Sequence, residues 1–241
     1  MLSIIIPTLN EGKNIINLIN EIIKVLKNYK IQIYIIDGNS LDKTVYKIKS
    51  LGLKNINIFI SPKKKTNIPH NCRDIHIGLE QSFINKKNQY FIIFDGDGSY
   101  DPRQIIQMLK IIKDKKCGFV QATKNHKNAN IERSYFRIFV SKFYHFISVI
   151  LLGNKITSDF SAAYRCYDRN TAKLLLKRKI KFVGAIQHLE DFLYLKSKKI
   201  NHYEIPMKYR KRVHGKSNVK LTLYLLYVFE LFQCLLKYKK N

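Results

Sequence analysis

Two aspartates one residue apart, Asp95 and Asp97, follow an apolar run from Tyr90 to Phe94 and precede several turn-forming residues. The run is β-branched and aromatic, which is typical of a buried strand that ends at the aspartates. Mg²⁺ and Mn²⁺ prefer oxygen ligands and commonly bridge from carboxylates to the phosphates of a substrate. The pair therefore predicts a site for Mg²⁺ or Mn²⁺ with Asp95 and Asp97 as ligands. The simpler alternative is an Asp-Gly turn that closes the strand.

Acidic residues also follow two other predicted strands. The strand at 2–6 leads into Pro7 and Glu11, and the strand at 31–36 leads into Asp37. The carboxyl ends of parallel strands share one edge of an α/β sheet, and ligands bind there. Three acidic loops at one edge predict the pocket of a nucleotide sugar, because carboxylates accept N–H groups of the base while basic side chains and a cation hold the phosphates. Each loop taken alone also has an explanation as a turn or a helix cap.

Strand-like and helix-like patterns alternate along the first half of the chain. This alternation predicts an α/β fold with a largely parallel sheet and right-handed crossovers. The predicted strands cover residues 2–6, 31–36, 56–60, 90–94 and 118–122. The predicted helices between them cover residues 11–26, 42–51, 72–83 and 102–112.

The second half changes character and is rich in aromatic residues. Tyr135–Leu152 predicts an amphipathic helix with an aromatic face, which either packs on the core or forms a surface for lipid. The apolar stretch 221–236 ends in the basic segment 237–240, which favours an interfacial helix with a basic anchor over a helix docked on the sheet. Between these two segments, helices are predicted at 170–176 and 188–196, and a strand at 203–206.

No linker rich in glycine or serine divides the chain. We therefore expect one catalytic domain over residues 1–218, followed by a C-terminal amphipathic helix over residues 219–241. No stretch is expected to be long and apolar enough to span a membrane.

In this order, the three loops resemble those of family 2 glycosyltransferases, which have the GT-A fold. The sequence IIIPTLNE resembles the opening motif of that family, and IIDGNSLDKT resembles its second motif, although Gly38 stands where the family usually has a second aspartate. The resemblance implies a Rossmann-like, mostly parallel sheet flanked by helices, and inverting transfer from a nucleotide-diphosphate sugar. It implies a donor site made of Pro7, Asn10, Glu11, Asp37, Arg73, Asp95 and Lys216.

Motifs in the second half resemble those of dolichyl- and polyprenyl-phosphate mannose or glucose synthases. Asp159 and Arg165 in DFSAAYRCYDR match that group, as does Arg212 in EIPMKYRKRVHGKSN, where Asn218 replaces a lysine. The resemblance implies a polyprenyl phosphate as acceptor, with Arg212 offsetting the charge on the leaving nucleoside diphosphate. It implies an acceptor site made of Asp159, Ser161, Arg165, His214 and Ser217.

The segment QHLEDF leaves the class of acceptor open. Glu190 matches the polyprenyl-phosphate group, whereas Glu190-Asp191 also resembles family members in which the aspartate is a general base. A phosphate is already ionised near neutral pH, but a hydroxyl needs a base. The alternative function is therefore transfer to a hydroxyl of a surface polysaccharide or a lipid-linked glycan, with Asp191 as base. The implied catalytic residues are Asp97, Arg212, Glu190 and Asp191.

The chain is strongly basic, with 44 Lys and Arg against 17 Asp and Glu and a net charge of +27. Such a field attracts polyanions, and we expect an anionic membrane surface as a partner. A nucleic-acid-binding protein is a remote alternative, because no RNA-recognition or helix-turn-helix pattern is present. The four cysteines lack metal-ligand spacing and fit a reducing compartment. We therefore expect a cytoplasmic protein, peripheral at the inner face of the membrane.

Overall fold

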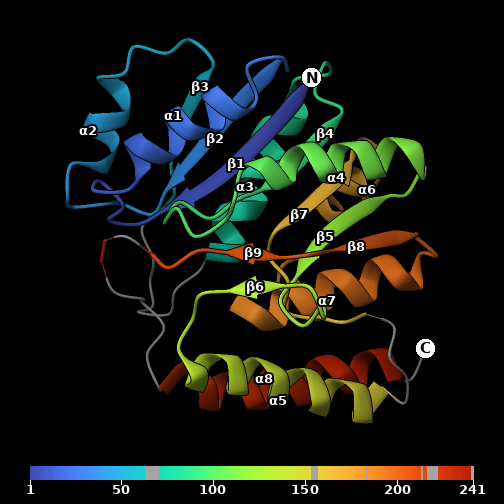
Figure 1. Ribbon diagram of the computed structural model, residues 1–241. Helices are drawn as coiled ribbons and strands as arrows, with labels where there is room; N and C mark the ends of the chain where they lie inside the picture. Colours follow the sequence, from blue (N-terminus) through green and yellow to red (C-terminus); the bar gives the residue numbers. More distant parts are fainter. Residues whose placement is uncertain (63–70, 153–156, 183, 213, 216–221, 240–241) are drawn as a thin grey trace.

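The computed structural model describes residues 1–62, 71–152, 157–182, 184–212, 214–215 and 222–239. Within these residues lies a seven-stranded sheet in the order β3-β2-β1-β4-β7-β5-β8 (Figure 1). Most neighbouring strands are parallel, which confirms the predicted α/β class. The strands are β1 (Leu2–Thr8), β2 (Ile31–Asp37), β3 (Ile56–Ile60), β4 (Tyr90–Ile93), β5 (Phe119–Thr123), β7 (Arg165–Asp168) and β8 (His202–Pro206).

Strand β7 departs from the predicted pattern. It runs antiparallel to both of its neighbours, β4 and β5, so that Cys166 lies opposite Ile92 on one side and Val120 on the other. The strand has four residues and begins and ends with a charged side chain, so it carries no alternating or apolar pattern. The motif that the resemblance assigns to the acceptor site therefore includes a strand in the middle of the sheet, which begins at Arg165.

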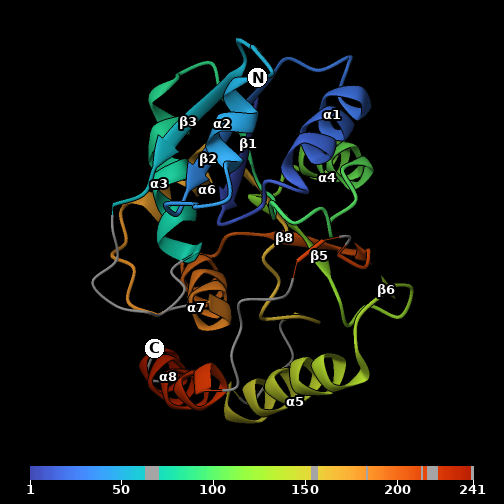
Figure 2. The same ribbon diagram turned by 90° about the vertical axis from the view of Figure 1, so that its left-hand side faces the viewer.

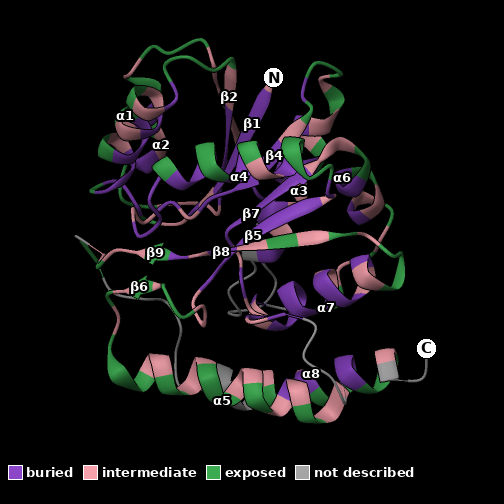
Figure 3. Ribbon diagram, turned by 45° about the vertical axis from the view of Figure 1, so that its right-hand side comes forward, coloured by how far each residue is buried: buried purple, intermediate pink, exposed green. Residues whose placement is uncertain are grey.

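Helices cover both faces of the sheet, and each face has its own hydrophobic core (Figure 3). On one face, Ile4 and Ile6 of β1 pack with apolar residues of α1, α2 and α4. On the other face, Ile5 packs with residues of α3, α6 and α7, because successive strand residues point to opposite faces. These helices are α1 (Ile15–Val25), α2 (Thr44–Lys49), α3 (Asn71–Ile84), α4 (Arg103–Asp114), α6 (Arg169–Leu176) and α7 (Gly184–Ser197).

Helices α5 (Tyr135–Leu152) and α8 (Thr222–Lys239) form a separate layer beyond α7, side by side and away from the sheet (Figures 1 and 2). Only Ser148 of α5 is fully buried, and the helix packs against the core through partly buried apolar residues such as Tyr144 and Ile147. Helix α8 buries Leu231 and Cys234 in the core beside α7. By length and composition alone, α5 could cross a membrane, which corrects the expectation that no stretch qualifies.

A short ribbon of β6 (Asn130–Ile131) and β9 (Lys208–Tyr209) connects these two layers. Strand β6 leads into α5, and β9 leads towards α8. Tyr209 forms an isolated bridge with Tyr100, in the loop that follows the predicted metal ligands. The ribbon therefore joins the α5–α8 layer to the carboxyl edge of the sheet.

Candidate active site

A cavity of about 900 Å³ lies between the carboxyl edge of the sheet and the α5–α8 layer. Its sheet end is lined by Asp95 and Asp97, from the loop after β4, and by Pro7 from β1. Its opposite end is lined by apolar side chains, among them Ile147 of α5 and Leu231 of α8. The cavity is thus acidic at one end and apolar at the other.

Asp95 and Asp97 lie together at the sheet end, as their spacing predicted. The backbone N–H of Ser99 donates to Asp97 Oδ1 at 2.9 Å, and the Tyr100 hydroxyl is hydrogen-bonded to Asp95. Burial, and then the charge of Asp97, raises the pKa of Asp95 to about 7. A divalent cation would relieve this excess of negative charge, and the oxygen donors suit Mg²⁺ or Mn²⁺.

The residues present fit a metal that is shared with a substrate. Among the described residues, no group of three or more His, Cys, Asp and Glu side chains is placed to hold an ion. Asp95 and Asp97 would therefore supply the protein ligands, and phosphate oxygens and water the remainder, which is the usual arrangement for Mg²⁺.

Arg212 lies beside the aspartates, although it is more than 100 residues away in sequence. Its Nη1 is 3.9 Å from Asp97 Oδ2, and its guanidinium also forms an ion pair with Glu11. Asn14 donates to Glu11 Oε2 at 2.8 Å and to the backbone carbonyl of His214 at 3.1 Å. These contacts fasten the loop after β9 to the loop after β1, and so hold a cation next to the predicted metal site.

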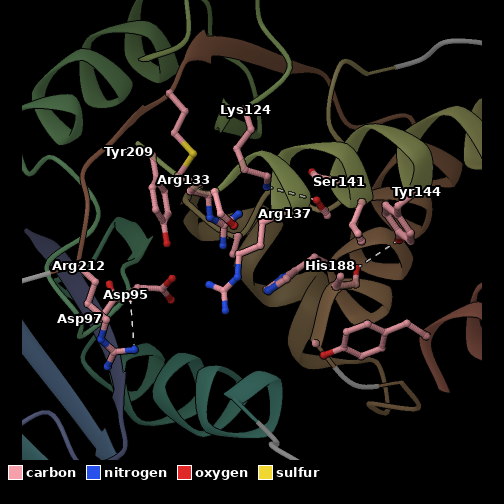
Figure 4. Close-up of a pocket in the computed structure, with 18 of the residues that line it drawn as sticks. Asp95, Asp97, Lys124, Arg133, Arg137, Ser141, Tyr144, His188, Tyr209 and Arg212 are labelled. Atoms are coloured by element: carbon pink, nitrogen blue, oxygen red, sulfur yellow. Dashed lines mark hydrogen bonds and ion pairs between the residues drawn. The ribbon is translucent and has the colours of Figure 1, made fainter. Parts of the chain in front are cut away.

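Further cations line the middle of the cavity. Arg133, just before α5, and Arg137, in its first turn, point into the space between the aspartates and His188 (Figure 4). The guanidinium of Arg133 stacks 4.5 Å from the Tyr209 ring, and its buried Nε has no hydrogen-bond partner among the described residues. Lys124 follows β5 and also lines the cavity. The middle of the cavity is therefore suited to an anion.

A sequence profile described as "Glycosyl transferase family 2" matches residues 3–173. The chain belongs to glycosyltransferase family 2. The predicted recognition is confirmed, and the chain is a member of a family of transferases.

The sequences of two curated relatives align with part of this glycosyltransferase. A Trichomonas vaginalis protein named dolichyl-phosphate beta-glucosyltransferase is 22% identical over 186 residues, which are 72% of this chain and 55% of that protein. An uncharacterized protein of Methanocaldococcus jannaschii is 26% identical over 138 residues, which are 57% of this chain and 58% of that protein. The glycosyltransferase thus spans between half and two thirds of the length of these relatives.

Solved structures of glucosyl-3-phosphoglycerate synthase from Mycobacterium tuberculosis share the fold. The complex with Mn²⁺ and UDP-glucose has a TM-score of 0.70 at 12% identity, covering 100% of this chain and 79% of that one. The complex with Mn²⁺, UDP and phosphoglyceric acid has a TM-score of 0.69, also at 12% identity, covering 99% and 78%. The likeness confirms the GT-A fold of this glycosyltransferase.

Of the remaining predicted donor residues, Pro7 lines the cavity and Asp37 does not. Asp37 is buried, and its carboxylate accepts hydrogen bonds from the Thr8 hydroxyl and from the backbone N–H and hydroxyl of Ser40. These hydrogen bonds hold the turn after β2 against β1, and contact of Asp37 with the base stays a prediction.

Three other predicted donor residues, Asn10, Glu11 and Arg73, do not line the cavity. Asn10 joins the loop after β1 to the loop after β2, through Ser40 and Leu41. Glu11 pairs with Arg212, and neither it nor the half-buried Arg73 lines the cavity. Lys216 lies outside the described residues.

The predicted acceptor residues are only partly brought together. Ser161 lines the cavity, whereas Asp159 is buried behind it and forms an ion pair with Lys124 at 2.9 Å. Burial would raise the pKa of Asp159, but Lys124 and the other donors around its carboxylate lower it. Asp159 is therefore a positioning residue for Lys124. The exposed His214 contributes its backbone carbonyl to the Arg212 loop, and Ser217 lies outside the described residues.

Arg165 lies behind the wall of the cavity. Its side chain is fully buried on β7, where it donates to Gln121 Oε1 at 3.2 Å and to the backbone carbonyl of His188 at 3.1 Å. It does not line the cavity, so it supports the wall of the site from behind and does not reach an acceptor.

Glu190 and Asp191 face away from the cavity. Glu190 is fully buried and forms ion pairs with Arg178 and with Lys237 of α8, the latter at 2.7 Å. Asp191 also pairs with Arg178 and lines a separate cavity of only about 20 Å³. Both carboxylates thus pair with an arginine outside the cavity lining, and their catalytic roles stay predictions.

Four residues that line the cavity were not predicted as site residues from the sequence: Lys124, Arg133, Arg137 and His188. Lys124 lies two residues after a predicted strand, and Arg133 and Arg137 flank the start of the predicted aromatic helix, so their positions carried a signal. His188 lines the cavity, and burial, followed by the charges of Arg165 and Lys124, lowers its pKa to about 3. Its imidazole is thus neutral at physiological pH.

Proposed function

We propose that the protein is an inverting glycosyltransferase that moves a sugar from a nucleotide-diphosphate sugar to a polyprenyl phosphate. One observation carries the proposal: a single cavity joins the aspartate pair to the apolar faces of α5 and α8. A donor diphosphate suits the first end, and the isoprenoid chain of a lipid acceptor suits the second. The cations between them suit the acceptor phosphate.

At the donor end, the proposal gives each residue a role. A bound Mg²⁺ or Mn²⁺, held by Asp95 and Asp97, would neutralise the diphosphate and make it a better leaving group. Arg212 lies next to Asp97, so its charge can stabilise the leaving nucleoside diphosphate.

At the acceptor end, an oxygen of the polyprenyl phosphate attacks the anomeric carbon from the face opposite to the diphosphate. The bond from that carbon to the diphosphate oxygen breaks, and its electron pair leaves with the nucleoside diphosphate. Arg133 and Arg137 are placed to hold the attacking phosphate.

Neither His188 nor Asp191 is suited to serve as the base for a hydroxyl acceptor in this cavity. The neutral His188, with a pKa near 3, is a weak base, and Asp191 is paired with Arg178 elsewhere. A phosphate needs no proton removed, whereas a hydroxyl does. The named activity of the dolichyl-phosphate relative supports the same choice of acceptor.

The proposal places the enzyme at the cytoplasmic face of a membrane, because its acceptor is a lipid. Phe139 and Phe146 of α5 and Phe229 of α8 are exposed, and the net charge is +27. Aromatic side chains that enter the interface, together with basic residues that attract anionic lipid, are the usual means of peripheral attachment.

The test uses a soluble short-chain polyprenyl phosphate, with UDP- and GDP-sugars and either Mn²⁺ or Mg²⁺. We expect release of nucleoside diphosphate together with a lipid-extractable sugar. Ile147→Glu, inside the cavity, should lower this transfer at least tenfold, since a charge there opposes the apolar chain. Phe146→Glu, on the neighbouring exposed position outside the cavity, is the matched control and should retain it.

The opposite result would be transfer to a polyprenol or a sugar hydroxyl, with none to the phosphate. Loss of that transfer in Asp191→Asn would then support the hydroxyl acceptor with Asp191 as base.

A further inference from the structure

The second motif of the family usually has two adjacent aspartates, and this chain has only the first of them, Asp37. Position 38 is a glycine, and the adjacent Asp37 is buried, lies outside the cavity lining and accepts hydrogen bonds from Thr8 and Ser40. Neither residue therefore places a carboxylate in the lining of the cavity. The nucleobase site needs its acceptor for N–H groups from another part of the chain.

Asp74 lies in this position. It belongs to the first turn of α3 and lines the cavity together with Pro7, Thr8 and Leu9. A Cβ atom built on Gly38 would stand 3.6 Å from Asp74 Oδ2 and 3.4 Å from the Thr8 carbonyl oxygen. The carboxylate of Asp74 thus occupies the region that a side chain at position 38 would enter.

The surroundings of Asp74 hold it in a fixed place. The Ser61 hydroxyl donates to Asp74 Oδ1 at 2.6 Å, and the Ser61 backbone N–H donates to the Asp37 carbonyl at 2.8 Å. Helix α3 also lies close against β1, because a Cβ on Gly78 would stand only 2.3 Å from Ile5 Cγ2. A rigid helix and a bound hydroxyl therefore orient the carboxylate relative to the end of β1.

We propose that Asp74 is the residue that recognises the donor nucleobase, taking the place of the carboxylate absent at position 38. The inference rests on the proposed function, since it concerns the donor of that reaction. A carboxylate accepts a ring N–H beside a carbonyl group, which uracil and guanine possess. Cytosine and adenine carry an unprotonated ring nitrogen at the corresponding place, so its lone pair would face the carboxylate. Asp74 thus selects UDP- or GDP-sugars over those of cytidine and adenosine.

The experiment measures binding of UDP, GDP, CDP and ADP to the whole protein by calorimetry in the presence of Mn²⁺. We expect UDP or GDP to bind at least tenfold more tightly than CDP and ADP. Asp74→Asn keeps the size of the side chain but places an N–H₂ group towards the base. It should weaken the preferred nucleotide about tenfold and leave CDP and ADP almost unchanged. A merely structural role for Asp74 would weaken all four nucleotides alike.

A second variant makes the test independent of any loss of folding in the first. Gly38 is not among the glycines with a left-handed backbone, so an aspartate is allowed there. Gly38→Asp combined with Asp74→Asn should restore the preference for UDP or GDP, because it returns one carboxylate to the same region. Asp114→Asn, on the exposed end of α4, is the matched control and should bind as the parent does.

The inference is overturned if Asp74→Asn folds and keeps the parent's preference among the four nucleotides, and the proposed function then still stands. It is equally overturned if the double variant folds, shown by thermal unfolding, but regains no preference. If the parent binds none of the four nucleotides with Mn²⁺, the proposed function fails as well.

Discussion

The surroundings of Asp95 in the fold change the pKa of its carboxyl group. Asp95 and Asp97 lie close enough for each charge to oppose the other, and burial adds to this effect at Asp95. The pKa of Asp95 therefore rises from 3.8 to about 7. Without a cation, the folded protein holds the proton of Asp95 over a range in which the unfolded chain has lost it.

This difference predicts a pH-dependent response to metal. Ionisation of Asp95 opposes folding progressively as the pH rises from about 4 to about 7, and a bound cation removes that cost. At pH 6 a carboxyl with a pKa near 7 is about nine-tenths protonated, so Mn²⁺ affinity should be about tenfold lower than at pH 8. The rise in melting temperature on adding Mn²⁺ and UDP should accordingly be larger at pH 8 than at pH 6.

Asp97→Asn is the matched test of that prediction. It removes one metal ligand and should abolish the Mn²⁺-dependent rise in melting temperature at both pH values, together with metal-dependent cleavage of the donor. An equal response to Mn²⁺ at pH 6 and pH 8 in the parent protein would contradict the role given to Asp95.

At the scale of elements, the sequence predicts strand positions best where an apolar run is followed directly by residues that can bind a ligand. The strand ends that carry Pro7 and Asp95 were placed correctly, because long apolar runs precede them and only the carboxyl edge of a parallel sheet gathers such loops. Strand β7 was missed because its four residues gain their strand conformation from β4 and β5 on either side. Tertiary pairing of this kind leaves no local signal.

Side-chain direction was harder to predict than element position. Arg165 was expected at the acceptor, and its register on β7 turns it into the core beside Gln121. Asp191 was expected at the cavity, but α7 directs His188 there instead, three residues earlier. A helix turns by about 100° per residue, so a motif read along the chain does not fix which member faces the ligand.

The ion pairs of Glu190 give a prediction about how α8 is attached. Glu190→Gln leaves Arg178 buried without its full charge partner and removes the ion pair with Lys237 of α8. We expect the free energy of unfolding, measured by urea denaturation, to fall by about 3 kcal/mol. Donor cleavage by the folded variant should stay within about twofold of the parent.

Glu80→Gln, a largely exposed carboxylate of α3 that pairs with His76, is the control and should change stability little. A stable Glu190→Gln protein that has lost donor cleavage would show instead that Glu190 takes part in the chemistry.

At the scale of the whole molecule, the proposed function places the sheet and its helices in water and the α5–α8 layer against lipid. The sheet and its helices bury their apolar residues in two cores, whereas most of α5 is exposed or only partly buried (Figure 3). Its exposed residues include the aromatic Phe139 and Phe146. Monomeric proteins rarely expose such a patch without a partner for it. The same layer forms the apolar wall of the cavity, so the surface and the acceptor site are continuous.

That continuity predicts where the protein meets a bilayer. Phe139 and Phe146 of α5 and Phe229 of α8 are between 59% and 66% exposed, and none of them lines the cavity. Replacing all three by glutamate should lower binding to vesicles that contain phosphatidylglycerol at least tenfold, since the substitutions remove apolar contact and add charge that anionic lipid repels. Co-sedimentation at low and high salt measures this, and parent binding should weaken as salt rises, because basic residues contribute about 1 kcal/mol each near an anionic surface.

The control replaces Leu41 and Ile84, which are 92% and 73% exposed but lie on the sheet domain, by glutamate. This double variant should bind vesicles nearly as the parent does, because only the α5–α8 layer is expected to touch lipid. Its binding need not be identical, since two added negative charges lower the net charge of +27 slightly. Equal loss of binding in both variants would mean that overall charge holds the protein at the membrane. The lipid acceptor would then have to reach the cavity by a route other than the α5–α8 layer.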